Sequence, residues 1–142
     1  MSKGEEKRRK RHSLRVSWDG KAIAGVDGVS PLVRDVEVIK VREGSSPTSP
    51  LTLPGRITSE PVTIERPADG DTAFEQWATA VGSSGARKDV TVEVLDRDGG
   101  VLLAYRLRDC WPSEYRVELL GPRARAAAVE HLRLENDGWE HI

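Results

Sequence analysis

Polar and apolar residues alternate with a period of two along most of the chain, and this pattern predicts a protein built mainly from β-strands. In "SLRVSWDG", Leu14, Val16 and Trp18 fall on one face of a strand, and the "DG" at 19–20 is a hairpin turn signal. We therefore expect "KAIAGV" to be the return strand. A second turn signal, "DGVSP" at 27–31, would end it.

The segment 32–44, "LVRDVEVIKVREG", is long for a strand, and neither of its faces is wholly apolar. One face would carry Arg34, Val36, Val38, Lys40 and Arg42. The other would carry Val33, Asp35, Glu37, Ile39 and Val41. A strand buried inside a small domain has at least one dry face. The pattern therefore predicts a strand with one side on its own domain and the other on water or a partner subunit.

A proline-rich and serine-rich stretch at 44–55, "GSSPTSPLTLPG", predicts a long loop. The apolar Leu51 and Leu53 argue against a loop that is free in solution. "RITSEPVTIERP" then reads as the partner of the long strand, so that 33–43 and 57–66 form a hairpin arm.

One helix is predicted within "DGDTAFEQWATAVGSSG". Its apolar stripe follows the spacing i, i+3, i+4, i+7 and consists of Phe74, Trp77, Ala78 and Val81. Asp71 or Thr72 can cap the start, with Glu75 completing a capping box, and Gly82 suits the left-handed C-terminal position.

The last third returns to strands. "KDVTVEVLDRDGGVLLAYRLRDCW" predicts a hairpin in which Trp111 and Pro112 mark the strand end, and "AAAVEHLRLE" predicts a further strand. The fold class is therefore mainly β, sandwich-like or barrel-like, with about seven strands and one α-helix. The expected core anchors are Trp18, Phe74, Trp77 and Trp111.

Composition separates a basic start from a single domain at 13–142. The net charge of −1 hides the run "MSKGEEKRRKRH" at 1–12, which predicts a flexible basic arm. Its alternative is a nucleic-acid-binding element, although no aromatic residue is interleaved to stack on bases. No run of about 18 apolar residues occurs, so no membrane span or membrane binding is expected. One cysteine excludes an internal disulfide.

Catalytic chemistry is sparse in this sequence. Of the three histidines, His12 and His141 lie near the ends and only His131 falls within a strand, and no metal or phosphate-loop motif is present. We therefore predict no enzyme activity, metal or cofactor. Cys110 reads as a small buried side chain beside Asp109, which would raise its pKa. The catalytic alternative is a β-sandwich enzyme centred on Cys110 and His131.

Several stretches carry a resemblance to one family. "RLRDCWPSEYRVELL", with Trp111 and Pro112, and "AAAVEHLRLENDGWE", with the Val129-Glu130 step, resemble the C-terminal part of the tail tube proteins of contractile-tailed phages. That family includes the inner tube proteins of extracellular contractile injection systems. "VDGVSPLVRDVEVIKVREGS", "LPGRITSEPVTIERP", "FEQWA" and "RKDVTVEVLDRDG" resemble its earlier segments, so the likeness covers about residues 13–140. The basic arm, Ser30-Pro31 and "RPADGD" depart from the family pattern.

The resemblance implies a structural subunit of a contractile phage tail or injection system, with hexameric rings stacked around a lumen. The arm would join a β-barrel shared between subunits. Its candidate lumen or ring-contact residues are Arg34, Glu37, Lys40, Arg42, Glu60 and Arg66. The candidate stacking-loop residues are Leu51, Leu53 and Pro54. A tube initiator or a cap paralogue at the baseplate is the alternative.

The implied partners are other copies of the chain, sheath and baseplate proteins, and cargo or DNA in the lumen. The implied location is a virion tail or injection-system particle, made in the bacterial cytoplasm.

Overall fold

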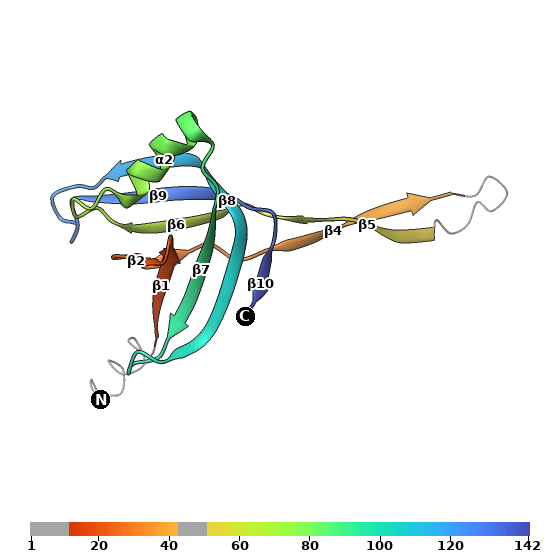
Figure 1. The fold of residues 1–142 in the computed structure, drawn as a ribbon, viewed down its shortest axis with the longest axis horizontal. Coiled ribbons are helices and arrows are strands. Elements are labelled where there is room, and N and C mark those ends of the chain that lie inside the picture. The colour runs from red at the N-terminus through yellow and green to blue at the C-terminus, as the bar shows by residue number, and fades with distance from the viewer. Residues whose placement is uncertain (1–11, 43–50) are drawn as a thin grey trace.

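The structure is a computed structural model that describes residues 12–42 and 51–142 (Figure 1). Its elements, in chain order, are β1 (Ser13–Trp18), β2 (Lys21–Ile23), β3 (Gly28–Val29), β4 (Arg34–Val41), β5 (Leu51–Ser59), β6 (Val62–Pro67), α2 (Ala73–Ser84), β7 (Lys88–Leu95), β8 (Val101–Leu119), β9 (Ala128–Glu135) and β10 (Trp139–His141). The prediction of a mainly β fold with one helix is confirmed. Among the described residues, no helix has the length and apolar character needed to cross a membrane.

The body of the molecule is an antiparallel sheet with the strand order β2-β1-β7-β8-β9-β6-β3, to which β10 adds by pairing with β8. The predicted turn at 19–20 is confirmed, because Trp18 and Lys21 are cross-strand partners. β8 is 19 residues long and belongs to two half-sheets. Its first half pairs with β7, and its second half, from Trp111 to Leu119, pairs with β9 (Figure 1).

The prediction that a strand ends at Trp111 and Pro112 is wrong, because the chain bends there without breaking its pairing. Asp109 adopts a left-handed conformation with φ 51°, and the register with β9 shifts between Pro112 and Glu114. A bulge of this kind tolerates a proline, which has no N–H to donate. β8 therefore turns a corner and continues into the second half-sheet.

The hydrophobic core lies between the two half-sheets and α2. Trp18, Phe74 and Trp77 are buried within it, and the Trp18 ring centre lies 4.8 Å from that of Trp77. Trp111 is only half-buried, so its prediction as a core anchor is wrong. Successive side chains of a strand point to opposite faces. Cys110 and Pro112, the neighbours of Trp111 in the sequence, are both buried and point toward the core.

Helix α2 covers β8 and β9 (Figure 1). Thr72 occupies its N-cap position but makes no side-chain capping bond, and the Ala73 N–H donates instead to Oδ1 of the preceding Asp71 at 2.8 Å. The left-handed residue at its end is Gly85, with φ 63°, rather than the expected Gly82. The indole N–H of Trp77 donates to the Ala86 carbonyl at 3.1 Å and joins the helix end to the core.

Within the described residues, strands β4 and β5 pair only with each other, and they project from the body as a long arm (Figure 1). The arm was expected to use residues 57–66, but β6 (Val62–Pro67) pairs with β3 and β9 in the body. Leu51, Leu53 and Pro54 lie on β5, so their prediction as loop residues is wrong. Pro54 is tolerated because each strand of a two-stranded ribbon has one unpaired edge. Residues 43–50 of the predicted loop lie outside the described part.

Candidate assembly surfaces

The arm, β4 with β5, exposes apolar side chains without a core of its own. All eight residues of β4 are exposed, and the exposed fractions are 48% for Val36, 65% for Val38 and 62% for Ile57. An isolated two-stranded hairpin is at best marginally stable in water. The arm therefore has the composition of a segment that another molecule covers.

The strand register divides the arm into two chemically different faces, since directly opposed residues share a face. We define the basic face as Arg34, Val36, Val38, Lys40, Thr52, Pro54, Ile57 and Ser59. We define the acidic face as Asp35, Glu37, Ile39, Val41, Leu51, Leu53, Gly55, Thr58 and Glu60. Gly55 belongs to this face, because a Cβ at this position would lie 2.5 Å from Oε1 of Glu37.

Two carboxyl groups meet on the acidic face at the root of the arm. A hydrogen bond with the Asp35 carboxyl, together with its charge, raises the pKa of Glu60 above its ordinary value. Both side chains are exposed.

The arm root is fixed to the body by Trp139. The Arg34 guanidinium lies 4.2 Å from the centre of the Trp139 ring and donates a hydrogen bond to the Trp139 carbonyl at 2.6 Å. The Trp139 indole N–H donates to the Val33 carbonyl at 3.3 Å, and the Asn136 amide donates to the Glu60 carbonyl at 3.1 Å. These contacts set the direction of the arm. Sequence analysis had identified Arg34 as a polar arm residue but not its partner Trp139.

A second charged surface covers the outward face of β6, β9 and the second half of β8; we call it the wall. At its centre His131 lies between two carboxylates, with Nδ1 3.3 Å from Glu65 Oε2 and Nε2 3.3 Å from Glu118 Oε1. Gly28 leaves room for Glu65, because a Cβ there would lie 2.6 Å from Glu65 Cγ. Arg133 belongs to the same face and donates to Ser113 Oγ at 2.9 Å.

The wall ends in two edges that have no strand partner in the described ranges 12–42 and 51–142. The half of β8 from Trp111 to Leu119 pairs only with β9, and β3 (Gly28–Val29) pairs only with β6. Unpaired edges present free N–H and C=O groups, which can pair with another chain. The wall is thus a sheet segment that can be extended from both sides.

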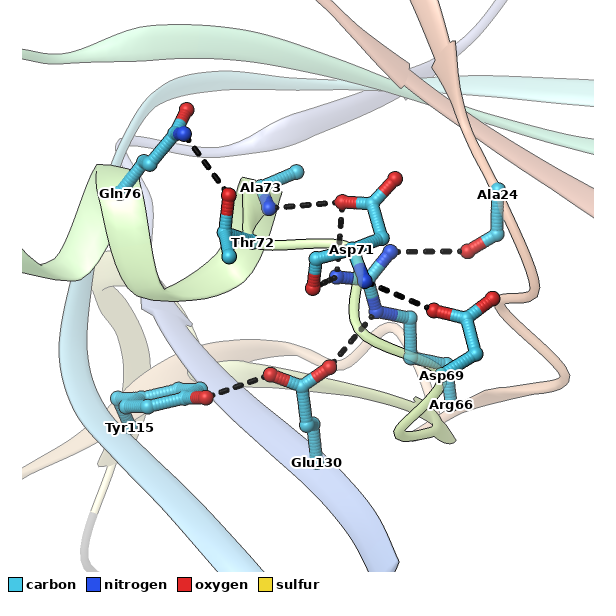
Figure 2. Close-up of polar contacts among 9 residues, drawn as sticks. All are labelled: Ala24, Arg66, Asp69, Asp71, Thr72, Ala73, Gln76, Tyr115 and Glu130. Carbon is cyan, nitrogen blue, oxygen red and sulfur yellow. Dashed lines mark hydrogen bonds and ion pairs between the residues drawn. The ribbon is translucent and has the colours of Figure 1, made fainter.

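Arg66 was a candidate lumen residue, and this prediction is wrong because its side chain is fully buried. Position 66 shares the inward parity of Val62 and Ile64 on β6. Figure 2 shows its guanidinium bonded to Glu130 Oε1 at 3.1 Å and to the Ala24 and Asp71 carbonyls, each at 3.0 Å.

The other oxygen of Glu130 accepts a hydrogen bond from the Tyr115 hydroxyl at 2.5 Å (Figure 2). Burial, together with this bond, raises the pKa of Tyr115 to about 12. The Arg66 guanidinium also lies 4.2 Å from the Phe74 ring centre. The cluster therefore joins β6, β8, β9 and the start of α2, and its role is structural.

The structure does not bring Cys110 and His131 together. Cys110 is fully buried in the core, and burial, followed by the charge of Asp89, raises the pKa of its thiol to about 12. His131 occupies the opposite face of the sheet, between Glu65 and Glu118. In the part of the chain that the structure covers, no three His, Cys, Asp or Glu side chains converge as metal ligands.

The remaining candidates all lie on or beside the arm. Lys40 is exposed on the basic face, Glu37 and Glu60 are exposed on the acidic side, and Arg42 is exposed directly after β4. Residues 1–11 of the basic N-terminal arm lie outside the described residues. The structure therefore leaves the nucleic-acid alternative as a prediction.

Comparison with solved structures finds chains that share this fold. A chain of the PVC sheath–tube complex of an extracellular contractile injection system is 19% identical, with a TM-score of 0.77 over 92% of this chain and 89% of that chain. A chain from the anti-feeding prophage tube terminating cap is 17% identical, with a TM-score of 0.77 over 91% and 87%. Hcp1 from Flavobacterium johnsoniae is 18% identical, with a TM-score of 0.63 over 91% and 94%. At these identities the likeness shows a shared fold.

Sequence comparison gives the family. No curated protein matches the chain. The sequence model described as T4-like virus tail tube protein gp19 matches residues 10–140, which is nearly the whole chain. The chain therefore belongs to the T4-like virus tail tube protein gp19 family.

Proposed function

We propose that this chain is the repeating structural subunit of the inner tube of a contractile phage tail or injection system, assembled as stacked hexameric rings. The observation that carries the proposal is the arm, whose exposed apolar residues lie on two opposite faces. Such an arm gains stability only when neighbouring molecules cover it. Membership of a tail tube family supports copies of the same chain as those neighbours.

The wall supplies the proposed ring closure. The free edge of β8 (Trp111–Leu119) in one subunit would pair with the β3 edge of the next, and repetition would close a barrel. The outward face of the wall would then line the lumen. This assigns the lumen chemistry to Glu65, His131 and Glu118 instead of the arm residues that the sequence suggested.

The proposed partners follow from the same assembly. Solved relatives come from a sheath–tube complex, a terminating cap and a baseplate, and we propose sheath and baseplate contacts for this chain. The lumen would pass DNA or protein cargo. The chain would be made in the bacterial cytoplasm and act within the particle, with a structural rather than a catalytic role.

Negative-stain electron microscopy of the purified protein at low and high concentration tests this proposal. We expect rings with a central hole at low concentration and stacked tubes at high concentration. The arm variant Val38→Asp serves as the comparison, and it should remain monomeric because the charge replaces an exposed apolar contact. Wild-type protein that stays monomeric even with a tube-nucleating baseplate complex would contradict the proposal.

The two alternatives give different results in solution. An initiator or cap subunit would form single rings that do not stack at any concentration. A nucleic-acid-binding module would bind DNA with a steep salt dependence that disappears when residues 1–11 are removed.

A further inference from the structure

The centre of the wall holds a histidine whose two ring nitrogens each face a carboxylate. Nδ1 of His131 lies 3.3 Å from Glu65 Oε2 on β6, and Nε2 lies 3.3 Å from Glu118 Oε1 on β8. Since β9, which carries the histidine, lies between β8 and β6 in the sheet, the ring joins three adjacent strands. We call these three residues the bridge.

The histidine of the bridge is buried although it points away from the core. The strand register places His131 opposite Glu65 on one side and Arg116 on the other, so all three share the outward face. His131 is only 8% exposed, whereas the side chains of Glu65 and Glu118 are 47% and 58% exposed. The ring therefore has carboxylates rather than bulk water as its main polar neighbours.

A glycine on the neighbouring strand determines where Glu65 lies. A Cβ at Gly28 on β3 would lie 2.6 Å from Cγ and 2.7 Å from Oε1 of Glu65. The Glu65 side chain thus lies directly against the β3 backbone, in space that a larger residue would occupy. The contact between Glu65 and His131 depends on this space.

A charged ring satisfies both contacts of the bridge, and a neutral ring satisfies one. A neutral imidazole has one N–H donor and one lone pair, whereas imidazolium has two donors. The contact of Nε2 with Glu118 has hydrogen-bond geometry, while the contact of Nδ1 with Glu65 meets only the distance of an ion pair. A neutral ring would therefore keep its proton on Nε2 and bind Glu118. Its Nδ1 lone pair would face Glu65 and repel it.

The charged groups around the ring come from each strand packed beside β9. Glu65 faces it from β6, and Glu118 and Arg116 face it from β8. On β9 itself, Arg133 lies two residues further along the same face and donates to Ser113. The bridge is therefore a single titratable ring between two carboxylates, with Arg116 as the nearest cation in the register.

We propose that the bridge is a pH-sensitive link between β6 and β8. Histidine is the side chain whose charge ordinarily changes between about pH 5 and pH 8. On the acidic side of this range the protonated ring holds Glu65 and Glu118 together across β9. As the pH rises through the range, the ring keeps Glu118 and releases Glu65. The stabilisation that the closed bridge provides is thus present at the lower pH and lost at the higher pH.

Opening of the bridge also changes the charge of the wall. The ring loses its positive charge, and Glu65 loses its cationic partner. The bridge lies within one chain, so it forms with or without assembly, and only its effect on a lumen rests on the proposed function. There, each subunit would present one more uncompensated negative charge to the lumen at alkaline than at acidic pH.

Nitrogen NMR of the His131 ring tests the bridge in the full chain, in solution for a monomer or in the solid state for tubes. The His131→Gln variant identifies the ring signals by their loss. At about pH 5.5 both ring nitrogens should carry a proton, and at about pH 8.5 the remaining proton should be on Nε2. A neutral ring with its proton on Nδ1, or a ring whose charge does not change over this interval, would overturn the proposal.

Urea unfolding of the dilute protein provides a second readout. The wild-type midpoint should fall between about pH 5.5 and about pH 8.5, and His131→Gln, which cannot become charged, should reduce this fall by about half or more. Glu65→Gln should have the same effect. Gly28→Ala should also have it, because its Cβ displaces Glu65 while all three bridge residues remain. The matched control is His141→Gln, which removes a histidine outside the wall and should leave the pH dependence unchanged.

The results separate the bridge from the proposed function. The same pH dependence in wild type, Glu65→Gln and Gly28→Ala would overturn the bridge, even if the microscope shows rings and tubes. These two variants disturb Glu65 by different means, so the test stands if His131→Gln fails to fold. A reduced pH dependence in both variants would support the bridge, even in a chain that never assembles.

Discussion

The body and the arm are both built from strands rich in valine and isoleucine, but they use these residues in opposite ways. In the body, Val16, Val62 and Ile64 are fully buried against the helix and the facing half-sheet. In the arm, Val38 and Ile57 are more than 60% exposed. We therefore expect the body to be stable within one chain and the arm to be stabilised by other molecules. The predictions below test this division.

A loss of body stability as large as that of any core truncation should come from Glu130→Ala. The change removes the buried one of the two carboxylates that pair with the fully buried Arg66 guanidinium and leaves only the more exposed Asp71, and breaking one side of a buried pair typically costs about 3–5 kcal/mol. Urea unfolding of the monomer measures this. The double variant Arg66→Met with Glu130→Leu is the control, and it should recover much of the lost free energy of unfolding. A single variant that loses less than about 1 kcal/mol would show that the pair is not needed.

A comparison of two tryptophans sharpens the boundary of the body core. Trp77 is 2% exposed, so Trp77→Ala should lower the free energy of unfolding by about 3–5 kcal/mol. Trp111 is half-buried beyond the bend in β8, so Trp111→Ala should cost less than about 2 kcal/mol. Thermal and urea unfolding of both variants decide the matter. Equal losses would place Trp111 in the core after all.

The arm should show the reverse behaviour when an exposed apolar residue is changed. Val38→Asp should shift the free energy of unfolding of the monomer by no more than about 0.5 kcal/mol, because the side chain is exposed. Its effect should appear in assembly, as a critical concentration raised at least tenfold in sedimentation. The matched control is Thr52→Asp, which places the same charge on the same face but opposite Lys40. A destabilised monomer would mean that the arm belongs to the body.

The smallest effect concerns the carboxyl pair at the arm root. Asp35 raises the pKa of Glu60 in the folded protein, so protonation of Glu60 stabilises this arrangement at pH values below its unfolded pKa. That contribution is lost as the pH rises through the folded pKa. In a carbon NMR titration, Asp35→Asn should move the Glu60 midpoint down toward the ordinary range of a glutamate pKa. Glu37→Gln should move it much less, and an unchanged midpoint in Asp35→Asn would contradict the pairing.

Local patterns predicted the elements of the fold well, because they depend on neighbouring residues. The "DG" turn after Trp18 and the apolar stripe of α2 each follow from a few positions. The arm strand was also recognised by its two mixed faces. Its partner was misplaced because the run at 51–59 contains Pro54 and Gly55, which usually mark loops.

Features that depend on residues far apart in the sequence were missed. Arg66 and Glu130 are 64 positions apart. The one sequence signal for their pairing is that each is a charged residue at a position where the strand pattern expects an inward-facing side chain. The Trp139 anchor of the arm likewise lies 105 residues from Arg34. The bend in β8 was read as a strand end because the left-handed conformation of Asp109 leaves no clear sequence pattern.

Hydrogen–deuterium exchange tests the division between body and arm most directly. We would compare backbone amides in the dilute monomer and in the assembled protein. The account predicts that amides of β4 and β5 exchange rapidly in the monomer and become protected on assembly, while core amides of β7 and β9 are protected in both states. Arm amides that are already protected in the monomer, or that stay unprotected in the assembly, would contradict it.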